Sequence, residues 1–384
     1  MATQFVDTAA VAPAPKSDAG KRYLLGPVAD FLCFGGASLI ILPLLLLLPV
    51  TEYKAGVVSA TLLLSYVLNY PHFAHSYQIF YRGYREKALT RALGRTMQMR
   101  YLFAGIAVPA LLVGFIVACS VAQNLRLLGY AANAMTFFVG WHYVKQGYGL
   151  LMVDAALKRR FFSDEEKQAL LVNSYVVWIA AWAVLNASLR KKNLLGVEYY
   201  TFDVPDAVLF VAVAAAAVTS AYTAWTLVRR WKAGRALPVN GLLAYFVSLY
   251  PWLLFISVSP LWVLTAPALH SLQYLAVVWH FEANYEKARL AEPDYKSGSI
   301  ARQVLGGNAA AHFALFVISG IALGYLGFRF LPILLTSVVP FDHAVLGSTL
   351  FLFAANIIIN IHHYFIDNVM WRRENPDAKR YLFG

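Results

Sequence analysis

Histidines are the residues best suited to chemistry in this chain of 384 residues, which contains nine of them. The stretch NIIINIHHYFIDNVMWRR, residues 356–373, is apolar enough for the last turns of a membrane helix, yet it holds His362, His363 and Asp367. Neutral imidazole is the commonest metal ligand in proteins, and carboxylate oxygens also bind metals. These residues indicate metal chemistry if the fold brings them together.

Six of the histidines are predicted to lie at one depth of a membrane. If their apolar segments are helices, each lies roughly 10–20 Å in from the cytoplasmic end of its helix, at about 1.5 Å per residue. The six are His72, His75, His142, His270, His362 and His363. A single intramembrane histidine is most often a packed residue that hydrogen-bonds to a neighbouring helix. Six at one depth favour a shared metal site that faces the interior of the bundle.

Helical periodicity, at about 100° per residue, predicts which polar side chains share a face. In the last segment the polar stripe consists of Asn356, Asn360, His363 and Asp367, and His362 points away from it. A second stripe consists of Ser65, Asn69, His72 and Ser76, with His75 at its edge. The other two stripes are His142 with Gln146, and His270 with Gln273 and His280. Four helices therefore present polar faces at a similar depth.

Other side chains on these faces are candidates for supporting roles. Asp367 and Tyr364 are candidate catalytic residues, and Asp367 is also a candidate metal ligand. Four amides are candidate cofactor-binding residues that orient the imidazoles: Asn69, Gln146, Gln273 and Asn360. The alternative is that these amides only hold helices together by hydrogen bonds, as amides often do in membrane bundles.

Ten apolar segments of the chain are long enough to position these residues within a bilayer. The chain is 60% hydrophobic and 14% charged, whereas soluble domains carry about 25% charged residues. About 20 residues span a bilayer core, and the candidates are 28–50, 55–81, 101–122, 127–154, 170–188, 205–228, 238–258, 260–282, 308–336 and 343–371. The predicted fold is an all-α polytopic membrane bundle of about ten transmembrane helices.

Lysine and arginine alternate along the chain as the positive-inside rule requires, which places both termini in the cytoplasm. Only the loop with Arg190, Lys191 and Lys192 departs from this pattern. The net charge of +12 is spread over these loops, so it favours membrane lipids as partners and excludes a nucleic-acid-binding domain. We expect a bacterial inner membrane protein with a disordered tail at 1–22, one membrane domain at 23–373 and a cytoplasmic tail at 374–384.

The ligand types narrow the chemistry. Histidine ligation with one carboxylate suits iron, zinc or copper, and the two cysteines, Cys33 and Cys119, offer no metal-ligand spacing. A site in the cytoplasmic half of a bilayer is reached most easily by lipidic molecules. Iron-dependent oxidation of a lipid therefore becomes the leading hypothesis.

The motifs HxxH at His72 and His75 and HH at His362 and His363 resemble the histidine boxes of integral-membrane non-haem iron enzymes. These are the fatty-acid desaturase and hydroxylase type and the Brp/Blh carotene-cleaving type, although the HxxxH and HxxHH boxes are absent here. The resemblance implies a non-haem iron enzyme that acts on a fatty, isoprenoid or carotenoid substrate, with an electron-donor protein as a partner. It makes ligand candidates of His72, His75, His142, His270 and His363.

Three other functions use the same residues. A haem electron-transfer protein would place two histidines as axial ligands, and His142 and His270 have matched depth. A proton- or metal-coupled transporter would use histidines, Asp367 and Lys145 along a path. A structural subunit that binds a pigment or a partner helix needs no chemistry at all. The outer halves of these segments are nearly all apolar, which favours a one-sided site over a pore.

Overall fold

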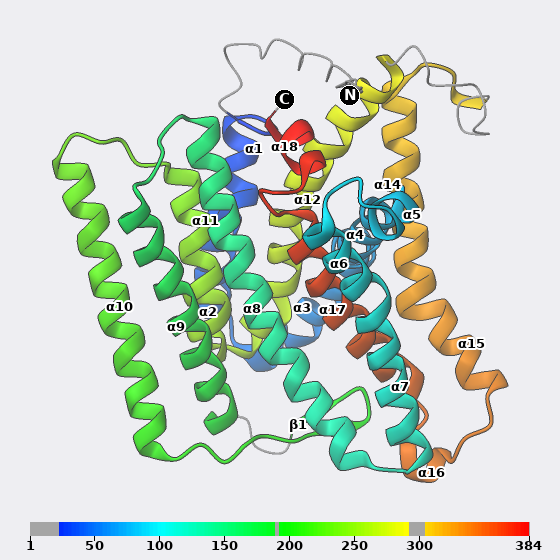
Figure 1. The fold of residues 1–384 in the computed structure, drawn as a ribbon. Coiled ribbons are helices and arrows are strands. Elements are labelled where there is room, and N and C mark those ends of the chain that lie inside the picture. Colours follow the sequence, from blue (N-terminus) through cyan, green and yellow to red (C-terminus); the bar gives the residue numbers. More distant parts are fainter. Residues whose placement is uncertain (1–22, 189–191, 292–303, 384) are drawn as a thin grey trace, which may run out of the picture.

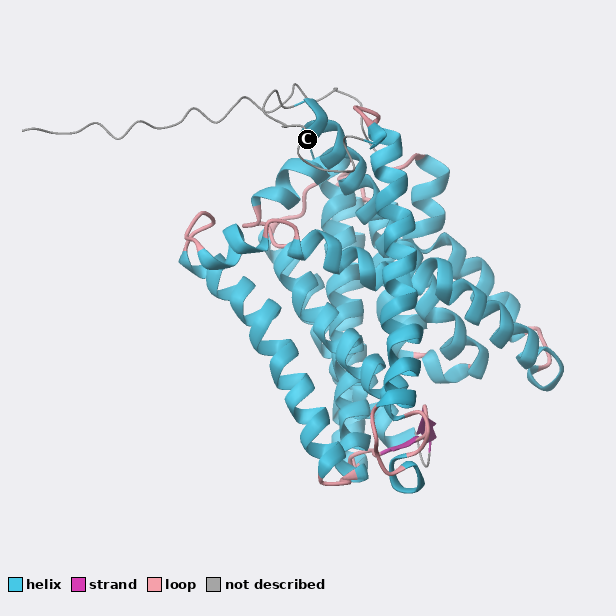
Figure 2. Cartoon of the chain, turned by 90° about the vertical axis from the view of Figure 1, so that its right-hand side faces the viewer, coloured by secondary structure: helices cyan, strands magenta, loops and turns pink. Residues whose placement is uncertain are grey.

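Helices form almost all of the described chain, residues 23–188, 192–291 and 304–383 of this computed structural model, as Figure 2 shows. The prediction of an all-α membrane bundle is confirmed in this respect. One element was not expected, a two-stranded antiparallel hairpin of β1 (Lys192–Leu194) and β2 (Val197–Tyr199). The predicted tail at 1–22 lies outside the described residues, as do Arg190 and Lys191.

Seven helical stretches of the described chain are long and apolar enough to cross a membrane. Three of them are joined from two α-helices: α1 (Pro27–Phe31) with α2 (Ala37–Leu46), α6 (Arg95–Leu102) with α7 (Val108–Val121), and α14 (Ala309–Tyr325) with α15 (Leu331–Val338). The others are α9 (Asp164–Ser188), α10 (Asp206–Lys232), α12 (Pro260–Ala291) and α17 (Leu350–Met370). The chain is therefore a membrane protein by the length and composition of its helices.

Three of the ten predicted segments are helical but are not both long and apolar enough to count as membrane-spanning candidates. They are α3 (Val50–Leu64) with α4 (Tyr70–Tyr81), α8 (Leu125–Leu157), and α11 (Val239–Leu249) with its π-helical extension Tyr250–Leu254. The first two carry histidine, glutamine and asparagine, which lower their apolar character. The third is short. The polar residues that suggest a site are thus the reason that two of its helices are weak transmembrane candidates.

Short helices cap the two ends of the bundle. They are α5 (Tyr84–Leu89), α16 (His343–Leu346) and α18 (Pro376–Phe383). The last lies within the predicted C-terminal tail, 374–384, where Tyr381 and Leu382 are buried and α18 packs on α12. Its proline at the first helical position and its apolar side chains explain why a helix forms there.

Prolines and π-helical segments bend the membrane helices. The π-helical segment Ser65–Asn69 joins α3 to α4, and Pro71 follows it directly. Proline has no N–H to donate to the residue four positions back, so the helix widens where that bond is missing. Similar π-helical segments, Leu32–Gly36, Phe103–Ala107 and Leu326–Phe330, join the paired helices described above. A short 3-10 turn, Ile256–Val258, precedes α12.

The helices that carry the polar faces lie in the middle of the bundle. In Figure 1, α4, α12 and α17 occupy the centre with α8 beside them, while α9 and α10 lie to one side and α14 and α15 to the other. Direct packing of α17 on α4 and α8, and of α12 on α4, brings the four helices together. The fold therefore gathers polar faces from segments up to 291 residues apart in the chain.

Candidate metal centre

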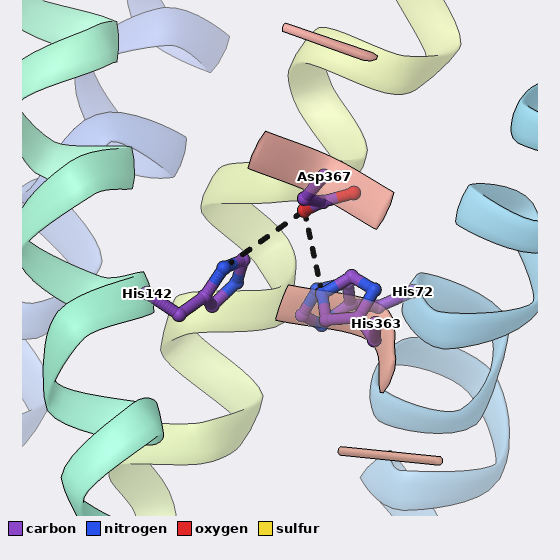
Figure 3. Close-up of side chains that lie close together, drawn as sticks. All are labelled: His72, His142, His363 and Asp367. Carbon is purple, nitrogen blue, oxygen red and sulfur yellow. Dashed lines mark hydrogen bonds and ion pairs between the residues drawn. The ribbon is translucent and has the colours of Figure 1, made fainter. Parts of the chain in front are cut away.

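Four histidines from four different helices converge in the interior of the bundle. His72 comes from α4, His142 from α8, His270 from α12 and His363 from α17, and each residue is 5% exposed or less. Asp367 joins them because it follows His363 by four residues on the same face of α17. Figure 3 shows this carboxylate directed at His142 and His363. One ligand atom from each of His72, His142, His363 and Asp367 lies within 4.8 Å of all the others.

His72 is oriented by hydrogen bonds on its far side. Its Nδ1 lies 2.9 Å from Ser271 Oγ, whose single hydroxyl proton has acceptors in Asn69 Oδ1 at 2.9 Å and Pro267 O at 2.8 Å. Ser271 therefore accepts a hydrogen bond from the Nδ1–H of His72. That tautomer leaves the lone pair of Nε2 aimed into the cluster, which is the arrangement that metal-binding histidines adopt.

The imidazole nitrogens approach one another closely. Nε2 of His72 and Nε2 of His363 are 2.9 Å apart, and Nε2 of His142 and Nε2 of His270 are 3.1 Å apart. Two nitrogens bound to one metal at about 2.1 Å and at a right angle lie about 3.0 Å apart. The spacing therefore fits neighbouring ligands of a single ion as well as it fits direct hydrogen bonds between imidazoles.

Asp367 has one oxygen held and one oxygen free for a ligand. Tyr274 donates a hydrogen bond to Asp367 Oδ1 at 2.8 Å, and Ser76 Oγ lies 2.5 Å from the same tyrosine hydroxyl. Asp367 Oδ2 lies 3.4 Å from Nε2 of His363 and 3.9 Å from Nδ1 of His142, and none of the described residues forms a hydrogen bond with it. A buried carboxylate oxygen without a partner is costly, and a bound cation would remove that cost.

Two predicted ligands do not join the cluster. His75 points toward α14, where its Nδ1 pairs with Gln78 Oε1 at 2.7 Å and its ring stacks on Phe316. His362 points away from the cluster, where its Nδ1 meets Tyr77 OH of α4 and its Nε2 meets Ala104 O between α6 and α7, both at 2.9 Å. The expectation of six converging histidines is therefore corrected to four. The helical period explains the exclusion of His362, which precedes His363 by one residue and therefore points about 100° away from it. It does not explain the exclusion of His75, because a residue three positions after His72 lies near the same face; the packing of α4 on α14 turns it away.

The predicted amides lie around the cluster, each in a different arrangement. Gln146 donates to Gln273 Oε1 at 2.7 Å and to the carbonyl of His270 at 3.2 Å, while Gln273 donates to Phe34 O. Asn69 reaches His72 only through Ser271. Asn360 bonds within α17, where its Oδ1 accepts from Tyr364 OH at 2.9 Å.

The predicted catalytic tyrosine and two residues outside the predicted set complete the surroundings. The ring of Tyr364 stacks on that of His142 with centroids 4.6 Å apart. Ser271 and Tyr274 orient His72 and Asp367 directly, yet they were not among the predicted site residues. Tyr274 follows His270 by four residues and shares its helical face, which tyrosine also takes in ordinary packing, whereas Ser271 lies about 100° from His270 and gave no such signal.

No family model, curated protein or solved structure matches this chain. The resemblance to histidine-box enzymes therefore stays a prediction, and the chemistry of the site rests on its own residues. Four imidazoles and one carboxylate, without a thiolate, can hold a first-row transition metal such as iron, zinc, copper or manganese.

Proposed function

We propose that this protein is a membrane-embedded oxidoreductase that uses a histidine-ligated non-haem iron to oxidise a lipidic substrate. The observation that carries the proposal is the cluster of His72, His142, His363 and Asp367, with ligand atoms within 4.8 Å of one another in a buried part of a membrane protein. Intramembrane ionisable residues are costly and usually mark a functional site. His270 provides a further imidazole beside His142.

The donor set supports iron without haem. Two histidines with one carboxylate are the ligand set of many non-haem iron oxygenases, and this set is present here in His72, His363 and Asp367. The two axial ligands of a haem lie on opposite faces of the macrocycle, about 4 Å apart if each metal–nitrogen bond is about 2.0 Å. His142 Nε2 and His270 Nε2 are 3.1 Å apart, with His72 5.0 Å from His270 between ring centroids. This spacing favours one compact ion over a haem between the two imidazoles.

The surroundings of the cluster support an apolar substrate. Phe73 lies 4.7 Å from His363, Tyr143 lies 4.1 Å from His270 and Tyr364 lies 4.6 Å from His142, measured between ring centroids. On the outer side, α17 contributes Phe353, Ile357 and Ile361 to an apolar core. Such packing excludes water and favours a one-sided site over the continuous polar path that a transporter needs.

The roles of the protein residues follow from the contacts. Bound iron would supply the one-electron and oxygen chemistry that side chains lack. Ser271 holds the tautomer of His72, and Tyr274 with Ser76 holds Asp367 in place. Tyr364 covers His142 and limits its access to water. Pre-set ligands of this kind need little rearrangement when the metal binds.

We further propose ten membrane crossings with both termini cytoplasmic, in a bacterial inner membrane. The three weaker helical stretches, α3 with α4, α8, and α11 with its extension, would complete the crossings. Support comes from α1 and α18, which lie at the same end of the bundle in Figure 1. The basic residues Arg85, Lys87, Arg229, Arg230 and Arg289 flank that end, as cytoplasmic loops require. An electron-donor protein would then meet this end.

The test is metal analysis with an optical spectrum on the detergent-purified protein after iron loading without oxygen. We expect about one iron per chain in the wild type and in His75→Ala, no iron in His72→Ala, and no Soret band in any sample. His75 is a matched control because it lies on the same helix but outside the cluster. Iron retained in His72→Ala would contradict the metal site, and a Soret band would establish haem instead.

Oxidoreductase activity needs a second measurement. Membranes that contain the wild-type protein should accumulate oxidised, desaturated or cleaved lipids that are absent with His72→Ala, as read by mass spectrometry of total lipid extracts. The His75→Ala membranes should resemble the wild type. Iron binding with identical lipid profiles in all three samples would overturn the oxidative function and leave a metal-binding or metal-transport protein.

A further inference from the structure

Arg329 is a charged residue within a predicted membrane span, away from the metal cluster. It lies in the π-helical segment Leu326–Phe330, twenty residues after the start of α14 and nine before the end of α15. Nine residues correspond to about 14 Å of helix, and the whole stretch is a candidate span. An arginine in such a position is costly unless it has a partner, and it usually marks a functional site.

Close packing of α14 on α4 fixes the position of this arginine. A side chain at Gly324 would meet the backbone of Tyr70 at 2.7 Å, so only glycine allows this approach. Phe328 then stacks on Tyr70, with ring centroids 4.7 Å apart, and Arg329 Nε donates to Tyr70 OH at 3.1 Å. The guanidinium is therefore held toward α4, two residues before the ligand His72.

The remaining guanidinium donors of Arg329 have no partner in the part of the chain that the structure describes. Within the described residues, the bond to Tyr70 is the one hydrogen bond or ion pair of the Arg329 side chain. The side chain is half-buried, and its apolar neighbours Tyr325 and Phe330 are 45% and 50% exposed, as expected for a lipid-facing surface. Arginine presents a planar fork of N–H groups that matches a carboxylate or a phosphate. An anion that arrives through the lipid would satisfy it.

Aromatic side chains connect this arginine to the metal cluster. Phe73 lies 5.1 Å from Phe328 and 4.7 Å from His363, between ring centroids. Tyr70, Phe73, Phe328 and Tyr364 belong to one buried cluster. These contacts place Arg329 beside an aromatic layer that ends at His363.

We propose that Arg329, with Tyr70, binds the carboxylate of a single-chain lipid that is the substrate of the metal centre. That the bound lipid is a substrate rests on the proposed function, whereas binding of its carboxylate at Arg329 does not require a metal. A carboxylate is preferred over a phospholipid phosphate because Arg329 lies within the span, where a single-chain lipid can bring its head without a bulky headgroup.

The experiment is equilibrium binding of tritiated palmitate to the purified, metal-free full-length protein by scintillation proximity. We expect Arg329→Gln to weaken binding about ten-fold or more, as for a lost charge-assisted hydrogen bond. The palmitate affinity of Arg329→Lys should lie between those of the wild type and Arg329→Gln, because lysine keeps the positive charge but lacks the planar pair of N–H donors. Unlabelled hexadecanol, which lacks the carboxylate, should displace labelled palmitate less well than unlabelled palmitate does in the wild type. In Arg329→Gln the two unlabelled lipids should displace it equally well.

The matched control is Arg126→Gln. Arg126 also contacts a tyrosine, Tyr130, but it lies at the outer start of α8. Palmitate binding should be unchanged in this variant. Equal affinity in the wild type and Arg329→Gln would overturn the proposal, and so would equal competition by hexadecanol in the wild type. Displacement by phosphatidylglycerol that exceeds displacement by palmitate and depends on Arg329 would replace the carboxylate with a lipid phosphate.

Failure of this site and failure of the metal centre are distinguishable. His72→Ala should lose iron and still bind palmitate, whereas Arg329→Gln should lose palmitate and keep iron. Thermal unfolding of both variants near the wild-type temperature shows that each has folded. If Arg329→Gln does not fold, Tyr70→Phe provides the second test, because it removes the one protein partner of the guanidinium, and the proposal expects weaker palmitate binding there as well.

Discussion

Two buried polar clusters within the membrane helices differ in how completely their hydrogen bonds close. The first joins α9, α10 and α11 through Asn173, whose Nδ2 donates to Tyr245 and Tyr250 and whose Oδ1 accepts from Thr219 and Ser220. Tyr250 donates in turn to Ser220, and none of these five residues, all of them described, has a buried polar atom without a partner. This cluster binds three helices together and has nothing left to offer a ligand.

The second cluster, around the four histidines, leaves polar atoms unsatisfied. Asp367 Oδ2, His270 Nδ1, His363 Nδ1 and Gln146 Oε1 are buried without a hydrogen-bond partner. In a medium of low polarity each such atom costs free energy, about 1–3 kcal/mol. A closed network is typical of helix packing, whereas an open one leaves polar atoms that a bound cation or an ordered water would satisfy. Hydrogen-bond satisfaction therefore distinguishes polar residues that only join helices from polar residues of a candidate site better than residue type does.

The largest expected effect tests whether His363 is a ligand. His363→Ala should weaken iron binding more than about 100-fold, beyond the effect of losing a residue that only orients a ligand. His362→Ala should keep full iron content, because both of its ring nitrogens pair with Tyr77 and Ala104 on another side of α17. Metal content after dialysis against a graded chelator measures both. Equal loss in the two variants would contradict the assignment.

Ser271→Ala should have the next largest effect. Removal of the hydroxyl frees His72 to take the other tautomer, which should weaken iron binding about 10–100-fold. Thr265→Ala is the matched control, because Thr265 on the same helix donates to Leu261 O as Ser271 does to Pro267 O but contacts no histidine. The same chelator titration applies. Unchanged affinity in Ser271→Ala would mean that the hydroxyl serves only the helix backbone.

Asn173→Ala should affect stability and leave the metal in place. It strands the hydroxyl groups that now bond to the amide, which should lower the free energy of unfolding by about 1–3 kcal/mol. Thermal unfolding followed by tryptophan fluorescence, with iron content on the same sample, measures both properties. Gln168→Ala, an exposed change on the same helix, should alter neither. Loss of iron in Asn173→Ala at a temperature where the protein is folded would mean that the two clusters are coupled.

The smallest effect is expected for Asn360→Ala. Asn360 bonds only within α17, to Asn356 and to Tyr364 OH, so iron affinity should change less than about two-fold, below the effect of residues that orient a ligand. Gln146→Ala is the comparison, because Gln146 supports His270 and Gln273 directly and should weaken iron binding more. A larger loss of iron affinity in Asn360→Ala than in Gln146→Ala would show that the position of Tyr364 determines iron binding.

Helical periodicity was informative about the candidate site where the helix is regular. On α17 it separated His363 and Asp367 from His362, and the structure places these residues as that angle requires. On α4 it placed His75 at the edge of the polar stripe, and the structure turns that side chain toward α14. The angle alone could not decide an edge position, because the π-helical segment Ser65–Asn69 and Pro71 alter the helix just before it.

Composition and periodicity alone determined that this chain is a helical membrane protein with polar faces at one depth, because hydrocarbon tolerates few other ways to bury a backbone or an imidazole. Only the tertiary structure decided which faces meet. The choice of His270 on α12 over His75 on α4 depends on how α12, α14 and α4 pack, and packing is a property of pairs of helices. The same holds for Ser271 and Tyr274, whose importance lies in the partner across the interface.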